Sequence, residues 1–158
     1  MHASLRFCAI ALLLVLWSSP ARASQACALI GARDMASIFG GPIEPGVEGD
    51  IQAALLCGFT HRNETINVGV MPTSMVSPDP TAAFDDAVAA GEVGVIQPIP
   101  GLGEKAVYVA ANAGTSVADY DIYVLVGNRI LNIDVTGTNA PDIKTALIAA
   151  AKRIAEKL

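Results

Sequence analysis

The sequence predicts a two-layer α+β domain, in which helices pack on one face of a mainly antiparallel sheet. Apolar and polar residues alternate along 120–126 and 129–136, and Gly127-Asn128 between them suits a tight hairpin turn. Residues 141–157 carry apolar side chains at helical spacing, as expected for a helix that packs on a sheet. Because short loops join neighbouring strands, antiparallel pairing is favoured over crossover connections.

The first 23 residues have the layout of a cleavable secretory signal peptide. Arg6 supplies positive charge, residues 10–17 are apolar throughout, and the Ala-Arg-Ala of 21–23 places small residues where a signal peptidase cleaves. The apolar run is shorter than the about 20 residues of a membrane-spanning helix. We therefore expect removal of residues 1–23, and a single exported domain over 24–158 that is periplasmic or secreted and has no membrane span.

Composition after position 23 argues against several classes of partner. Arg6 and Arg22 precede that point, so eight basic residues remain against 15 acidic ones, a formal charge of −7. A surface this acidic disfavours nucleic acid and anionic lipid. Trp17 is the single Trp of the chain, so its loss leaves few rings for stacking on sugars or bases. An unidentified protein or small molecule remains as the expected partner.

Two cysteines, Cys27 and Cys57, remain in the predicted mature chain. An even count in an oxidising compartment predicts one disulfide, which would close a loop of about 30 residues. The alternative is a lipid anchor on Cys27, since the Ser-Gln-Ala of 24–26 places a small residue directly before it. That segment lacks the large aliphatic residue of a lipoprotein signal, so the sequence favours the disulfide.

The first half of the expected domain predicts a helix, a loop and a hairpin. Residues 32–39 carry apolar side chains at helical spacing, and the glycines and proline that follow end that helix. Residues 42–50 hold two prolines, two glycines and three acidic residues, which predicts a loop. Residues 52–60 and 65–71 alternate as strands do, and the short polar segment 61–64 joins them.

The second half predicts a linker, a helix and three strands before the final helix. Residues 72–80 form the linker, and the helix over 79–91 has an aspartate cap, a proline in its first turn and a closing glycine. Residues 93–103 are rich in proline and glycine and predict an irregular segment. Residues 105–110 predict a strand that leads to the 120–136 hairpin.

One face of that hairpin is acidic. If the Gly127-Asn128 turn is tight, Asp121 and Asp134 lie directly opposite each other. Asp119 lies one step along, and Asn132 lies on the same face. Like charges directly across a ladder repel, so this arrangement needs an explanation.

Three interpretations of the acidic face remain open. Water screens the charges, or Lys105 or Arg62 neutralises them. The carboxylates bind a hard cation such as Ca²⁺, with Asn132 as a further oxygen ligand. The carboxylate pair acts as general acid and base in a hydrolase. Because no calcium-loop spacing is present, the solvated or neutralised face is favoured, and we assign no metal and no catalytic residue.

Other apparent motifs lack the context that their chemistry needs. The Gly-x-Gly-x-x-Ala of 101–106 precedes a strand, whereas a dinucleotide-binding loop opens a helix. His61 is the single histidine after the signal, too few for a histidine-rich zinc site, and we expect it to be solvated in its hairpin loop. The serines that could act as nucleophiles are Ser37, Ser74, Ser77 and Ser116. No Gly-x-Ser-x-Gly motif surrounds any of them.

Several short marks together resemble a family of uncharacterised bacterial exported proteins, many of them lipoproteins. They are the Cys-Ala-Leu-Ile of 27–30 before a helix ending at Gly40, Cys57 followed by Phe59, and the Gly-Leu-Gly-Glu-Lys-Ala of 101–106 before a strand. The resemblance implies an exported α+β domain with a cysteine pair and no catalytic residues. The chain departs from the family pattern where Gly31 replaces a Ser or Thr helix cap, and its lipid-anchor signal is imperfect.

The sequence therefore favours a non-catalytic exported domain, without a cofactor, that binds a protein or small ligand or supports the cell envelope. The alternative is a hydrolase or cation-binding protein that uses the acidic face of the 119–136 hairpin. A third hypothesis is a carrier of hydrophobic molecules, which requires a pocket between the sheet and the helices.

Overall fold

The structure is a computed structural model. It describes residues 25–29, 31–51, 53–91, 94–113, 115, 118–137 and 143–158. The predicted signal peptide, residues 141–142 at the start of the predicted last helix and Ser116 lie outside the described residues.

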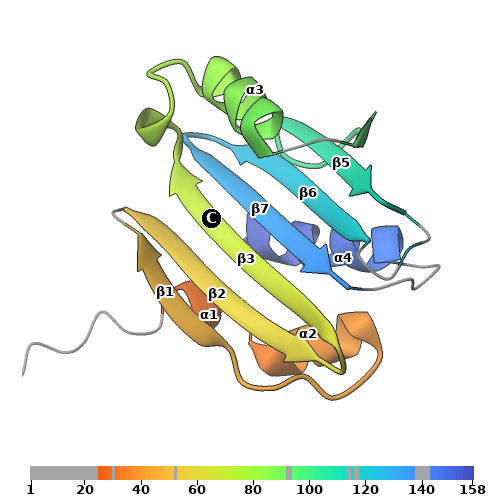
Figure 1. The fold of residues 1–158 in the computed structure, drawn as a ribbon. Coiled ribbons are helices and arrows are strands. Elements are labelled where there is room, and N and C mark those ends of the chain that lie inside the picture. Colours follow the sequence, from red (N-terminus) through yellow and green to blue (C-terminus); the bar gives the residue numbers. More distant parts are fainter. Residues whose placement is uncertain are drawn as a thin grey trace, which may run out of the picture.

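Within these residues, seven strands form one sheet in which every neighbouring pair is antiparallel. The order across the sheet is β1-β2-β3-β7-β6-β5-β4, so β7 lies at its centre between β3 and β6 (Figure 1). The α+β class and the antiparallel sheet are thus confirmed. The strands are β1 Val47–Ile51, β2 Ala54–His61, β3 Glu64–Pro72, β4 Val95–Pro98, β5 Lys105–Ala111, β6 Asp119–Val126 and β7 Arg129–Thr136.

The helices lie on both faces of the sheet. In the described part of the chain they are α1 Gln25–Leu29, α2 Ala32–Phe39, α3 Pro80–Gly91 and α4 Ile143–Ala155, and a 3₁₀ turn, η1, lies at Thr73–Met75. Figure 1 shows α1, α2 and α4 behind the sheet and α3 in front of it. The prediction that the helices pack on one face is therefore not confirmed.

Packing explains this arrangement, because β5 and the second half of β6 carry buried apolar side chains on both faces, and Ile130 of β7 extends the second apolar face. On one face, Ile122 and Ile133 pack in the main core with Leu147 of α4. On the other face, Phe84 of α3 packs against a second cluster that includes Leu125 of β6. A sheet covered on both faces shows continuous apolar runs rather than strict alternation.

Two predicted irregular segments contain edge strands. The prediction of a loop over 42–50 is wrong from Val47, because β1 pairs with β2 through its main chain. The prediction of an irregular 93–103 is wrong for Val95–Pro98, which pairs with β5. Pro98 is tolerated there because an edge strand leaves every second N–H without a ladder partner. Edge strands form by pairing, so their own composition need not favour β structure.

Candidate functional site

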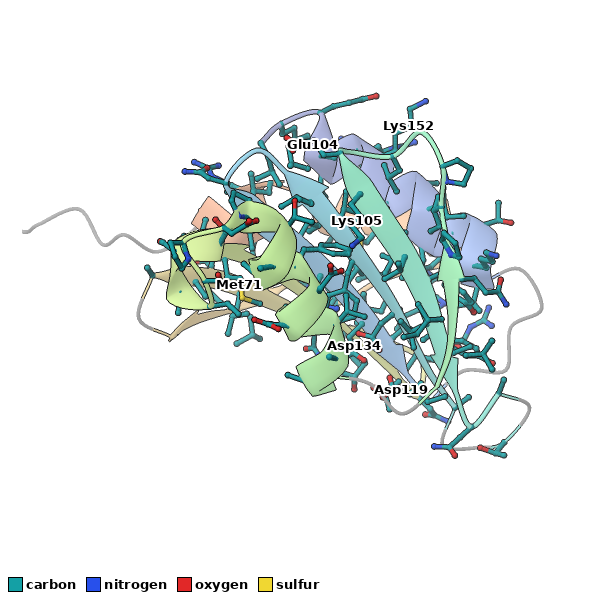
Figure 2. The ribbon with its side chains drawn as sticks, turned by 90° about the horizontal axis from the view of Figure 1, so that it is seen from above. Met71, Glu104, Lys105, Asp119, Asp134 and Lys152 are labelled. Carbon is teal, nitrogen blue, oxygen red and sulfur yellow. A yellow bond between two sulfur atoms is a disulfide. The ribbon has the colours of Figure 1, made fainter. Side chains whose placement is uncertain are left out.

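The acidic face has the register that the sequence predicts. Asp121 of β6 is paired with Asp134 of β7, and Asp119 lies two residues before Asp121 on the same face. Carboxylate oxygens of the three residues all lie within 4.8 Å of one another. In Figure 2, Asp119 and Asp134 lie near one end of the sheet, and Lys105 lies farther along it. This acidic cluster shares the face on which α3 packs.

Hydrogen bonds from β3 and from β7 itself hold Asp134 in place. Asn67 of β3 donates through Nδ2 to Asp134 Oδ1 at 2.7 Å. Thr136 Oγ1 lies 3.2 Å from Asp134 Oδ2 and 3.4 Å from Asp119 Oδ1, so its hydroxyl bridges the two carboxylates. These contacts position the carboxylates but supply no positive charge.

Asp121 is the buried member of the cluster, with 5% of its surface exposed. Asn132 donates through Nδ2 to Asp121 Oδ1 at 2.9 Å. The amide nitrogen of Asn132 therefore faces the cluster, whereas the sequence suggested an oxygen ligand for a cation. In this orientation Asn132 stabilises the negative charge of Asp121 without a metal.

A proton offsets part of the repulsion in the cluster. Burial raises the pKa of Asp134 to about 7, and the hydrogen bond with Asp119 and the charges of Asp121 and Asp119 act in the same direction. The hydrogen bond from Asn67 lowers the pKa but does not offset these effects. Near neutral pH, the cluster therefore exchanges a proton with solvent. A carboxyl group that ionises there suits general acid–base chemistry, and it also binds cations more tightly as pH rises.

The two cations that the sequence suggested as neutralising groups lie elsewhere. Lys105 contacts Asp85 of α3, and its ammonium lies 5.3 Å from the ring centroid of Phe84 (Figure 2). Arg62 borders a pocket on the opposite face of the sheet. Neither position is the one expected for neutralising the acidic cluster.

That pocket lies between α2, α4 and the β2–β3 turn, and has a volume of about 350 Å³. Its lining combines apolar side chains with polar and charged ones. Among the described residues, the apolar ones are Ile38, Phe39, Ile143, Ala146 and Ala149. Apolar walls with a few polar groups are typical of small-molecule sites. The sequence did not predict this pocket, because α2, the turn and α4 are far apart along the chain.

Charged and polar side chains surround the apolar walls. Arg153 of α4 lies 3.5 Å from Asp34 and 3.3 Å from Ser37 Oγ, and it borders the pocket from one side. Arg62 and Glu64 border it from the β2–β3 turn. Arg62 has a φ of 54°, so this turn holds it in the left-handed region.

His61 is buried, in contrast to the solvated side chain that we expected. It is 2% exposed and lies on the face of β2 that carries Phe59. Its Nδ1 donates to the carbonyl oxygen of Pro42 at 2.7 Å. A Cβ at Gly41 would lie 2.6 Å from His61 Cε1, so the chain passes directly over the ring. The backbone contact fixes the ring beside the pocket and places the proton of the neutral form on Nδ1.

The pocket contains a serine and a histidine, but their contacts do not build a hydrolytic triad. Ser37 Oγ donates to the carbonyl oxygen of Asp34 at 2.7 Å. The Nδ1 of His61 donates to a backbone carbonyl, whereas in a triad it donates to a carboxylate. Gly101 and Gly103 adopt positive φ in a turn that enters strand β5, so that glycine motif opens no helix.

The predicted disulfide joins Cys27 of α1 to Cys57 of β2, with the two Cα atoms 5.1 Å apart. A Cβ at Gly46 would overlap Cys57 Sγ and lie 2.8 Å from Cys27 Sγ. The disulfide thereby closes one end of the main core, next to the edge strand β1.

No protein-family model matches this chain, and no curated protein matches it in sequence. Within the part of the chain that the structure describes, no helix has the length and apolar character needed to cross a membrane.

Proposed function

We propose that this chain is an exported, non-catalytic binding domain that takes a small amphipathic molecule in the pocket between α2 and α4. The observation that carries the proposal is the pocket itself. It has apolar walls, a volume of about 350 Å³ and a rim of charged side chains. This volume falls in the lower part of the range found for small-molecule sites, which is roughly 300–1,000 Å³.

Export is proposed from the signal-like segment 1–23 and is supported by the disulfide. Structural disulfides persist in oxidising compartments such as the bacterial periplasm, so we propose a periplasmic or secreted location. The disulfide uses the sulfur of Cys27 that a lipid anchor would need. The resemblance to bacterial exported proteins points to the same compartment.

A non-catalytic role is proposed because of how the polar groups of the pocket are engaged. Ser37 Oγ and His61 Nδ1 both donate to backbone carbonyls. A nucleophile and its base would instead be hydrogen-bonded to each other. Shape and charge then remain as the properties that this pocket offers to a ligand.

The proposal can be tested with a substitution, at an exposed position, whose larger side chain fills the pocket. Ala149 is exposed on α4 and borders the pocket, so Ala149→Phe should occupy the cavity with little effect on the core. The control, Ala89→Phe, makes the same change at an exposed position of α3 on the other face. NMR titration with octanoate and 1-octanol should show binding to the wild type and the control but not to Ala149→Phe. The proposal fails if neither probe binds the wild type, or if both bind Ala149→Phe equally well.

A second candidate function uses the acidic cluster. Three carboxylates within 4.8 Å of one another, one with a pKa of about 7, favour a divalent-cation site or an acid–base centre. Asp119, Asp121 and Asp134 would supply the oxygen ligands. The effect of Ca²⁺ and Mg²⁺ on the melting temperature at two pH values tests this candidate.

A further inference from the structure

We infer that the ligand of the α2–α4 pocket is a small amphipathic monoanion, a carboxylate with a short apolar chain. This inference rests on the proposed function and adds the chemical class of the ligand. The apolar walls favour the hydrocarbon chain of the ligand, and the charges at the rim of the pocket favour its head group.

The charge at the rim differs from the charge of the chain as a whole. The full chain has ten basic and 15 acidic residues. Among the described residues that border the pocket, the charged ones are nevertheless two arginines, Arg62 and Arg153, and one acidic residue, Glu64. A local excess of positive charge beside low-dielectric walls attracts anions and disfavours cations.

Arg62 is the arginine available to a ligand. In the described part of the chain it forms no ion pair, whereas Arg153 lies 3.5 Å from Asp34. The tight turn also limits how far the backbone of Arg62 can move, since its φ of 54° is one that few side chains adopt. The Arg62 side chain is exposed, and a guanidinium is suited to a planar carboxylate, with which it can form two parallel hydrogen bonds.

Glu64 limits the charge of the ligand. Its position opposite His61 in the β2–β3 register places a carboxylate on the same rim as Arg62. A dianionic head group would meet this negative charge, whereas a monoanion can lie near the arginines. Glu64 is therefore the residue that should favour one negative charge over two.

The volume of the pocket limits the length of the ligand's hydrocarbon chain. At about 30 Å³ for each water-sized group, 350 Å³ holds on the order of ten such groups. Octanoate, with an eight-carbon chain and one carboxylate, is a probe of this size. 1-Octanol and octylammonium keep the chain and change the head group to a neutral one or a cation.

The experiment measures dissociation constants of the three probes for the wild type and three variants at low ionic strength. Arg62→Gln removes the available positive charge and keeps a long polar side chain. Glu64→Gln removes the negative charge of the rim. Arg129→Gln is the control, because Arg129 is exposed at the β6–β7 turn, away from the pocket.

The wild type should bind octanoate about tenfold more tightly than 1-octanol, and octylammonium least tightly. Arg62→Gln should weaken the binding of octanoate about three- to tenfold and leave the binding of 1-octanol unchanged. Glu64→Gln should strengthen the binding of octanoate, and Arg129→Gln should change the binding of neither octanoate nor 1-octanol. Added salt should weaken the binding of octanoate and leave that of 1-octanol unchanged.

Two further outcomes separate the inference from the proposed function. Equal binding of octanoate and 1-octanol to the wild type, unaffected by Arg62→Gln, overturns the monoanion inference and leaves the binding function standing. Tighter binding of octylammonium overturns it in the same way. Failure of all three probes to bind the wild type overturns the proposed function, and the inference with it.

Discussion

Asp121 and Asp134 face each other across the β6–β7 ladder, and their carboxylates lie within 4.8 Å of each other and of Asp119. Like charges in such positions are destabilising unless something offsets them. Lys105 and Arg62 lie elsewhere, and the pKa of Asp134 is raised to about 7, chiefly by burial. A bound proton is therefore one means by which the folded chain tolerates this cluster.

Stability should depend on the protonation of Asp134. Its pKa is about 7 in the folded state, against an ordinary value of 3.8 in the unfolded chain. Between these values the folded state binds more protons, so this group stabilises the fold fully below pH 4 and loses that effect as pH rises through 7. Water screens a partly exposed group, so we expect a loss of about 1–2 kcal/mol between pH 5 and 8. Urea denaturation across this range measures the loss.

Asp134→Asn provides the matched variant for that measurement. The amide oxygen can still accept the hydrogen bond from Asn67, while one charge of the cluster is removed. The variant should be more stable than the wild type at pH 8 by about 1–2 kcal/mol and should lose most of the pH dependence. Asp86→Asn, exposed on α3, changes the net charge equally and should keep the wild-type profile. A wild-type profile that rises steadily from pH 5 to 8 contradicts this prediction.

Divalent cations should compete with the proton if the acidic cluster is a metal site. Calcium at millimolar concentration should then raise the melting temperature by several degrees at pH 8 and much less at pH 5.5. Replacement of both Asp121 and Asp134 by Asn should abolish the shift. The same screen with Mg²⁺ tests selectivity, because Mg²⁺ demands a more regular oxygen shell. No shift with either metal at pH 8 removes the cation candidate.

The parts of the fold that the sequence predicts well are those specified by local chemistry. The turn at Gly127-Asn128 fixes the register of the last hairpin, so the pairing of Asp121 with Asp134 follows from counting residues. Helix α2 ends at Gly40, whose φ of 73° is the left-handed conformation expected of a closing glycine. Pairs and caps of this kind depend on neighbours in sequence.

The parts that the sequence misses depend on distant neighbours. The segment Val47–Ile51 is a strand because the edge of β2 offers it hydrogen-bonding groups. The placement of α3 on the other face could have been predicted from the continuous apolar run of β6 from Ile122 to Leu125, because such a run indicates burial on both faces. The pocket had no such local signal, since Phe39, Arg62 and Ala149 come together only through packing.

The placement of α3 can be tested at Phe84. This side chain is 1% exposed and packs in the second apolar cluster, on the face away from α4. Phe84→Ala should cost about 3–5 kcal/mol through lost burial and the cavity that remains. Octanoate binding should be unchanged under conditions where the variant is folded, because the pocket lies on the other face. A cost below about 1 kcal/mol contradicts the packing of α3.

The disulfide should contribute chiefly through the entropy of the unfolded chain. Cys27 and Cys57 are separated by 30 residues, and a loop of this length predicts a contribution of about 3–4 kcal/mol. Replacement of both cysteines by serine should lower the urea midpoint accordingly. Reductant should have the same effect on the wild type and none on the double variant. Equal midpoints for the wild type with and without reductant contradict the prediction.

Gly46 should be intolerant of a side chain because of the same disulfide. An added Cβ would overlap Cys57 Sγ and lie 2.7 Å from Cε1 of Phe59, a ring that is 2% exposed. Neither the covalently bound sulfur nor the buried ring can move away freely, so Gly46→Ala should cost about 1–3 kcal/mol. Gly31→Ala is the control, because no atom would lie within 4 Å of its Cβ. In the variant that lacks both cysteines, the cost of Gly46→Ala should fall, since serine leaves more space. An unchanged cost there would mean that Phe59, rather than the disulfide, excludes the methyl group.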